Sequence, residues 1–194
     1  MAEETAQVIR VLGFAGSLRR ASYNRALLEV AKGLAPPTLE IAIFDLAEVP
    51  LYNADVEAAG DPSAVRALKD AVAHADGVLI ATPEYNFSIP GGLKNLIDWL
   101  SRGDDQPFAL KPVAILSASA GPVGGARVQY DLRKVMLFMN AQVLAKPEVF
   151  IGMAGTKFDA EGRCTDDTTR KFVTDQMAAF QRWIAAVGRM RAGA

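Results

Sequence analysis

The segment GVLIATPEYNFSIPGGLKNLIDWL, residues 77–100, contains the clearest indication of the fold class. It begins with an unbroken apolar run from Gly77 to Ala81, which is typical of a parallel strand covered on both faces. It ends with apolar residues at helical spacing, namely Leu93, Leu96, Ile97 and Leu100. A loop with prolines, aromatics and an amide lies between them. The segment therefore predicts a strand, a loop and a helix over 90–101.

The same alternation continues on both sides of this segment. The apolar patterns predict further strands at 8–14, 39–44, 113–117 and within 143–151, and further helices at 24–34, 62–75, 125–140 and 166–190. Five strands alternating with five helices predict a parallel sheet with helices on both faces. A chain of 194 residues without a linker or repeat should form one domain, 1–194, with its core at about 8–188. The connection 45–61 is long, and its role stays open.

Composition removes several classes of function. A net charge of −1 gives no reason to expect nucleic acid or an anionic membrane as a partner. No apolar run approaches the roughly 20 residues that cross a bilayer. The acidic N-terminal stretch 1–11 has no apolar signal core, and the single cysteine, Cys164, suits a reducing compartment, so we expect a cytoplasmic protein. With one histidine, His74, and one cysteine, no metal site is expected.

The loop after the first strand has the features of a phosphate site. In doubly wound folds, ligands bind beyond the carboxyl ends of the strands. There the sequence reads GSLRRASYN, 16–24, in which Gly16 allows a tight turn and Ser17 and Ser22 offer hydroxyls. The helix N-terminus adds free N–H groups, and Arg19 or Arg20 adds a full charge. The alternative is a capped helix with two solvated arginines. Triphosphate and dinucleotide motifs are absent from the sequence.

Two further strand ends carry specialised loops. The segment TPEYNFSIPGG, 82–92, suits a rigid loop that places backbone amides and an aromatic ring against a flat heterocycle. A plain turn with a helix start at Pro90 is the alternative. The segment SASAGPVGG, 117–125, lets another edge of such a ring approach the backbone closely. Three such loops at strand ends together favour a ligand site over three ordinary turns.

These segments resemble the NADPH-dependent FMN reductase family, and within it the bacterial chromate and quinone reductases. The matching pieces are G-S-L-R-x-x-S-x-N at 16–24, P-E-Y-N-x-S-x-P-G-x-L-K-N-x-I-D-W at 83–99 and the glycine loop at 121–125. The resemblance implies a flavodoxin-like three-layer sandwich, with a five-stranded parallel sheet in the order 2-1-3-4-5. It also implies an FMN-dependent oxidoreductase that takes hydride from NADPH or NADH and reduces quinones, with chromate, azo and nitro compounds as further candidates.

The resemblance assigns site residues by position. Those implied to hold the FMN phosphate are Ser17, Arg19, Ser22 and Asn24. Those implied to line the isoalloxazine ring are Pro83, Glu84, Tyr85, Asn86 and Phe87, with Ser117, Gly121 and Gly124 along its other edge. No side chain is expected to act as nucleophile or general base, because the flavin carries the chemistry. Tyr85 is expected to shape the acceptor site.

Three other functions are alternatives to this one. A free-flavin reductase would use the same cofactor chemistry and is the main alternative. An electron-carrier flavodoxin is less favoured, because such carriers are usually strongly acidic and this chain is nearly neutral. A phospho-acceptor signalling domain needs an aspartate at the end of the third strand, where this chain has Thr82-Pro83.

The helix at 125–140 predicts self-association. One face, with Val128, Leu132, Val135 and Met139, suffices to cover the sheet. Additional apolar bulk comes from Met136, Leu137 and Phe138, and from Trp99 and Leu100 nearby. A large apolar patch of this kind favours a two-fold dimer. The resemblance implies a homodimer or homotetramer, with Arg127, Tyr130 and Glu148 as candidate contacts between dimers; the alternative is that these three are solvated surface residues.

Overall fold

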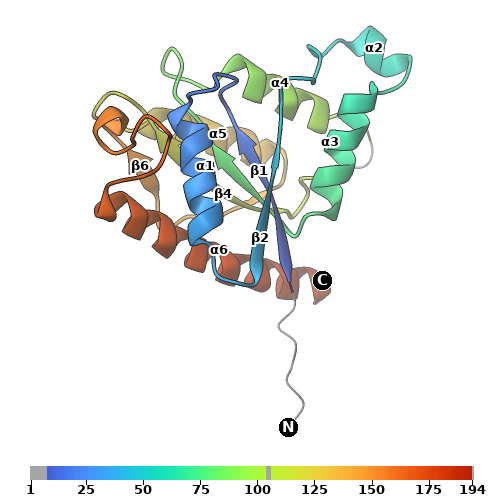
Figure 1. The fold of residues 1–194 in the computed structure, drawn as a ribbon. Coiled ribbons are helices and arrows are strands. Elements are labelled where there is room, and N and C mark those ends of the chain that lie inside the picture. Colours follow the sequence, from blue (N-terminus) through green and yellow to red (C-terminus); the bar gives the residue numbers. More distant parts are fainter. Residues whose placement is uncertain (1–7, 104–105, 194) are drawn as a thin grey trace.

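One parallel sheet forms the centre of the molecule (Figure 1). The computed structural model describes residues 8–103 and 106–193. The strands are β1 (Ile9–Ala15), β2 (Leu39–Phe44), β3 (Gly77–Ala81), β4 (Pro112–Ala118), β5 (Gln142–Val143) and β6 (Val149–Ile151). Their order is β2-β1-β3-β4-β5, with β6 also paired to β4, and every pair is parallel. The predicted order and the flavodoxin-like fold are thus confirmed.

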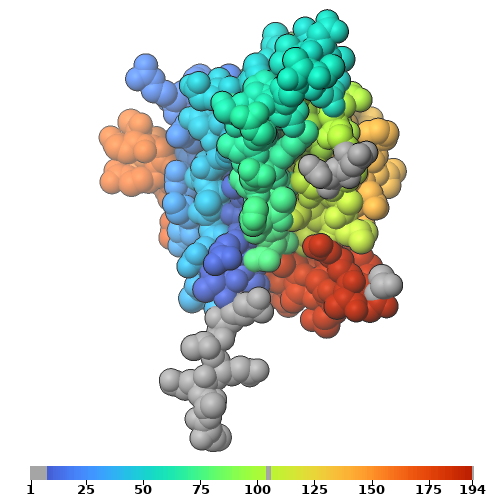
Figure 2. Space-filling view, turned by 90° about the vertical axis from the view of Figure 1, so that its right-hand side faces the viewer, coloured from blue at the N-terminus to red at the C-terminus, as the bar shows by residue number. Residues whose placement is uncertain are grey.

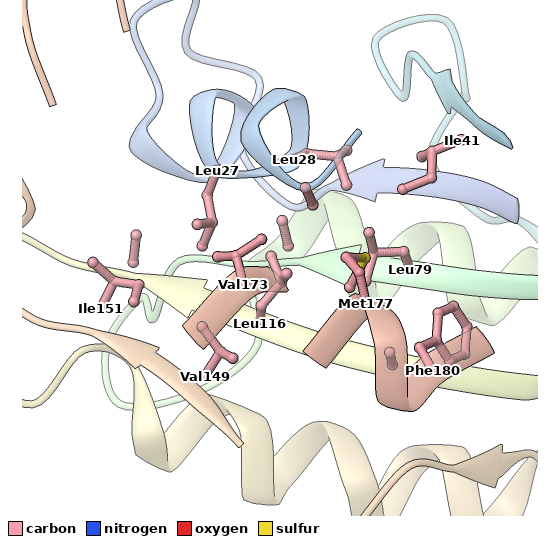
Figure 3. Close-up of a cluster of buried hydrophobic side chains, with 14 of the residues drawn as sticks. Leu27, Leu28, Ile41, Leu79, Leu116, Val149, Ile151, Val173, Met177 and Phe180 are labelled. Atoms are coloured by element: carbon pink, nitrogen blue, oxygen red, sulfur yellow. The ribbon is translucent and has the colours of Figure 1, made fainter. Parts of the chain in front are cut away.

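Helices cover both faces of the sheet (Figure 1). The helices α1 (Tyr23–Leu34) and α6 (Asp167–Ala192) lie on one face, and α3 (Ser63–His74), α4 (Gly91–Leu100) and α5 (Ala126–Phe138) lie on the other. Neighbouring strand residues point to opposite faces, so Val11 packs under α1 and α6 while Leu12 packs under the other layer. Figure 3 shows the core on the first of these faces, where Leu28 of α1 and Met177 and Phe180 of α6 lie against the strands.

The predicted strand within 143–151 is two short strands. The Leu144 N–H still donates to the Val113 carbonyl of β4 at 2.7 Å, and residues 145–148 then separate the two paired segments, where Pro147 has no N–H to donate. Gln176 of α6 bridges β4 and the break, because its Nε2 donates to the carbonyl oxygens of Ile115 and Pro147, at 3.0 Å each. Lys146, Pro147 and Glu148 also interrupt the apolar pattern at this point, so the sequence does carry a local signal of the break.

The connection 45–61 contains a short helix, α2 (Ala54–Ala58), that was not predicted. None of its residues is buried, so it has no apolar stripe to read. Its neighbours are held on α4: the Tyr52 N–H donates to Asn95 Oδ1 at 2.7 Å, and Trp99 Nε1 donates to the Pro50 carbonyl at 2.8 Å. Figure 2 shows this turquoise segment beyond the end of α3.

Burial corrects part of the predicted apolar patch. Trp99, Leu100 and Met136 are fully buried and belong to the core, so they add nothing to a surface. Leu137 and Phe138 remain, at 79% and 82% exposed. Helical spacing alone could not tell which apolar residues the sheet covers.

Residues 1–7 of the N-terminal stretch lie outside the described residues, and the domain limits 1–194 remain a prediction. A 3-10 turn at Ala154–Thr156 completes the described elements. Within residues 8–103 and 106–193, no helix combines the length and the apolar character that crossing a membrane requires.

Candidate functional site

The carboxyl ends of β1, β3 and β4 are tied together at one edge of the sheet. The Gly16 N–H donates to the Ala81 carbonyl at 2.8 Å, and the Thr82 N–H donates to the Leu116 carbonyl at 3.0 Å. A Cβ at Gly16 would lie 2.6 Å from Thr82 Oγ1, so glycine is what allows the first two loops to meet. The three loops singled out in the sequence therefore start side by side.

The first loop presents hydroxyls, a helix N-terminus and an exposed cation. Ser22 caps α1, and its Oγ accepts from two N–H groups of the first turn, at 3.2 and 3.4 Å. Ser17 Oγ accepts the Arg19 N–H at 3.3 Å. Because both oxygens accept from the backbone, each hydroxyl still has a proton to donate; that of Ser17 lies near the Tyr85 hydroxyl, at 3.3 Å between the oxygens. The side chain of Arg19 is exposed beside them. This set of donors suits a phosphate.

Asn24 is engaged with the backbone of β4. Its Nδ2 donates to the Ala118 carbonyl at 2.9 Å, and its Oδ1 accepts the Ala118 N–H at 2.8 Å. The residue is 2% exposed. The side chain thus connects α1 to the start of the third loop. Its amide nitrogen and oxygen both bind the protein backbone.

The second loop folds into a tight turn with aromatic rings at its tip. The N–H of Tyr85 donates to the Ser88 carbonyl at 3.1 Å, and the reverse bond measures 2.9 Å. Between them Asn86 and Phe87 have φ of 50° and 65°, as in a type I′ turn. A phenylalanine in the left-handed region is unusual, and such strain gathers at functional sites. Tyr85 and Phe87 are 49% and 68% exposed.

This turn is fastened to α5 and to the first loop. Glu84, behind the turn, forms an ion pair with Arg127. Ser88 Oγ donates to Asp131 Oδ2 at 3.1 Å. Hydrogen bonds from Lys134 and Ser88 hold the pKa of the Asp131 carboxyl below its usual value. The Tyr85 hydroxyl lies 3.3 Å from Ser17 Oγ. The tip is exposed, but its base is held on two sides.

The third loop is shaped from beneath by buried polar groups. Ser117 Oγ donates to the Gly124 carbonyl at 2.6 Å and accepts from Gln129 Nε2 at 2.8 Å. Ser117 is fully buried, so it supports the loop and does not face a ligand. Gly124 has φ of 65°, and the Met153 N–H donates to the Gly121 carbonyl at 3.0 Å. A Cβ at Gly121 would meet open space, which leaves room beside the backbone there.

Gln129 is not identified from the sequence as a residue that supports the site. It is fully buried on α5, three and seven residues before the core residues Leu132 and Met136. A polar residue at core spacing was the available signal, because such a group needs a buried partner. Its partners, the Ser117 hydroxyl and the Val149 carbonyl, lie on other elements, so the sequence alone could not identify them.

The residues present fit an FMN molecule. Hydroxyls, a helix N-terminus and Arg19 provide for one phosphate at one end of the site. Backbone amides, the rings of Tyr85 and Phe87, and the open backbone at Gly121 provide for a flat heterocycle at the other. The predicted site residues thus come from three loops that share one edge of the sheet, although Asn24 and Ser117 support these loops from within.

The three predicted assembly residues differ in setting. Tyr130 is 53% exposed. Glu148 accepts from Lys146 Nζ at 2.5 Å, and this bond, with a further one from Tyr130, holds the pKa of the Glu148 carboxyl below its usual value. Arg127 is instead paired with Glu84 in its own chain.

Residues 9–156 match the family described as NADPH-dependent FMN reductase. The chain is 51% identical over 176 residues to an NAD(P)H-dependent FMN reductase of Pseudomonas aeruginosa, covering 91% of this chain and 95% of the relative. It is 46% identical over 187 residues to a quinone reductase of Escherichia coli, covering 95% and 98%. Among solved structures, FerB, a flavoenzyme NAD(P)H:(acceptor) oxidoreductase from Paracoccus denitrificans, is similar with a TM-score of 0.85 at 37% identity, covering 92% and 98%.

Proposed function

The chain belongs to the NADPH-dependent FMN reductase family, and we propose that it passes electrons from NAD(P)H to quinones through FMN bound at the carboxyl edge of its sheet. It is accordingly an oxidoreductase that works with FMN and NAD(P)H, not an electron carrier or a signalling domain. The bound FMN would supply the two-electron chemistry that links the nicotinamide to the acceptor, while the protein would bind and orient it. The convergence of the three strand-end loops is the observation that carries the proposal.

Each loop would have its own part in this site. The phosphate would be held by the hydroxyls of Ser17 and Ser22, by the Arg19 guanidinium and by the N-terminus of α1. Asn24 and Ser117 would act by fixing the loops, since their polar groups are engaged with the protein. The ring would lie against the 83–87 loop and the backbone at Gly121 and Gly124. The residues proposed to line it from the second loop are Pro83, Glu84, Tyr85, Asn86 and Phe87.

Quinones are favoured as acceptors by the exposed aromatic rings of this loop. Tyr85 and Phe87 offer flat apolar surfaces at the mouth of the site, against which a planar acceptor can stack. The relative at 46% identity is named a quinone reductase. The relative at 51% identity is named an FMN reductase, so release of reduced free flavin is the second candidate.

Retention of the flavin during turnover tests the proposal. Protein loaded with FMN and freed of excess flavin by gel filtration is mixed with NADPH or NADH and a benzoquinone. We expect the quinone to be reduced while FMN stays with the protein. Turnover only after free FMN is added would favour the flavin reductase. A loaded protein that oxidises neither nicotinamide would refute both.

A homodimer through α4 and α5 would cover the exposed Leu137 and Phe138. Phe138 lines a groove of about 600 Å³ between these helices, which a second copy can fill. A tetramer would use Tyr130, Glu148 and the exposed side of Arg127 as contacts between dimers. Light scattering at micromolar concentration tests this, and a 20.7 kDa species would refute assembly. In a tetramer, Tyr130→Ala should yield dimers.

We further propose a cytoplasmic location, which the single free cysteine supports.

A further inference from the structure

Glu84 is a charged group almost removed from water. Its side chain is 7% exposed, and burial of a carboxylate is unfavourable unless partners compensate for the lost water. Two partners do so. The Arg127 guanidinium pairs with Oε1, and the Val128 N–H in the first turn of α5 donates to Oε2 at 3.3 Å. Both partners come from the start of one helix, so Glu84 joins the 83–88 loop to α5.

Arg127 also supports the strained tip of the same loop. Its guanidinium carbon lies 4.0 Å from the centroid of the Phe87 ring, which is within the range of a cation–π contact. Phe87 is the residue whose φ of 65° disfavours a large side chain. A single arginine thus contacts both the base and the tip of the turn. Its side chain is 49% exposed, so it reaches these groups from the surface.

We propose that Arg127 is a positioning residue of the flavin site, which holds the 83–88 turn in shape and balances the Glu84 charge beside bound FMN. The inference rests on the proposed function, because it takes this turn as the surface that meets the ring. Reduced FMN carries more negative charge than the oxidised form, and a nearby unbalanced carboxylate disfavours added negative charge. Arg127 therefore favours the reduced form, and its loss makes the flavin harder to reduce.

The charge balance is tested by a double-mutant cycle in FMN-loaded protein. Arg127→Ala should lower the preference for reduced over oxidised FMN about tenfold, which is about 30 mV in midpoint potential for a two-electron couple. Arg127→Ala combined with Glu84→Gln should bring the potential back to that of the unaltered protein, because no charge is left to balance. Lys171→Ala is the control, since it removes an equally charged side chain that is 70% exposed on α6.

The positioning role is tested by FMN binding to the apoprotein, followed by fluorescence. Arg127→Ala should weaken binding about tenfold. Arg127→Lys, which keeps the charge but loses the planar stack on Phe87, should retain the potential and lose part of the affinity. The lysine variant also serves if the alanine variant does not fold.

Three results would overturn the inference. The first is an Arg127→Ala protein with unaltered potential and FMN affinity. The second is a double variant whose potential stays as low as that of Arg127→Ala alone. The third is an Arg127→Ala protein that changes only its oligomeric mass, which would make the residue a subunit contact. Failure of the unaltered apoprotein to take up FMN is a separate result, which would refute the proposed function itself.

Discussion

Replacing Asn24 by alanine distinguishes a phosphate ligand from a structural tie. The resemblance implies that Asn24 holds the FMN phosphate, whereas its amide in the structure binds the N–H and the carbonyl of Ala118, 94 residues away in sequence. In Asn24→Ala both backbone groups lose their partner in a buried position. The variant should therefore destabilise the protein even when no flavin is bound.

The size of the effect follows from those two groups. A buried polar group left without a partner costs about 1–3 kcal/mol, so the pair costs about 2–6 kcal/mol. A loss of about 3 kcal/mol would lower the melting temperature by about 6–12 °C in a protein of this length. Asn24→Asp should also destabilise, because a carboxylate can accept from the Ala118 N–H but cannot donate to the Ala118 carbonyl.

Urea unfolding of the apoprotein is the assay, because bound FMN would add its own stabilisation. FMN affinity is measured in parallel by fluorescence titration. We expect both stability and affinity to fall in Asn24→Ala. A loss of apoprotein stability of less than about 1 kcal/mol would lie below the about 2–6 kcal/mol expected for two unpaired groups. If such a variant also binds FMN more than tenfold more weakly, Asn24 is a direct ligand and the structural reasoning is wrong.

Four further predictions concern single residues. Arg19→Ala should weaken FMN binding by roughly 1.5–3 kcal/mol, as for a charge-assisted hydrogen bond, without changing apoprotein stability; equal affinity would remove Arg19 from the site. Tyr85→Phe should keep substantial NADPH oxidation, whereas Tyr85→Ala should disturb acceptor binding; a loss above about a thousandfold in the Phe variant would indicate general acid catalysis. Gly124→Ala should lower the urea midpoint and FMN affinity, since its φ is 65° and its Cβ would lie 2.8 Å from the Phe150 carbonyl carbon; an unchanged midpoint would contradict this. Because Lys146 lowers the pKa of Glu148, the stabilisation is complete above the ordinary pKa of glutamate and is lost as the pH falls through the lowered value. Glu148→Gln should thus be less stable than the unaltered protein at neutral pH and approach it in acid, and a pH-independent gap in urea midpoints would speak against the ion pair.

The fold class and the three loops could be predicted from the sequence because their signals are local. The apolar run at 77–81 and the helical spacing after Pro90 each lie within a few residues, and such patterns indicate the type of element directly. The Ser22 cap is local too, since its bonds reach only two and three residues ahead. Parallel pairing then places the carboxyl ends of the strands at one edge, which is why the loops could be assigned to one site.

The contacts that hold the loops in place were decided by the tertiary structure. Asn24 meets Ala118, Glu84 meets Arg127 and Ser117 meets Gln129 across different elements. Likewise the burial of Met136 depends on how the sheet and its helices pack. The chemical types of the residues and their local spacing, both readable in the sequence, determined which residues could serve a ligand site. Which of them face a ligand and which hold the loops depends on partners distant in sequence, and only the folded chain brings those together.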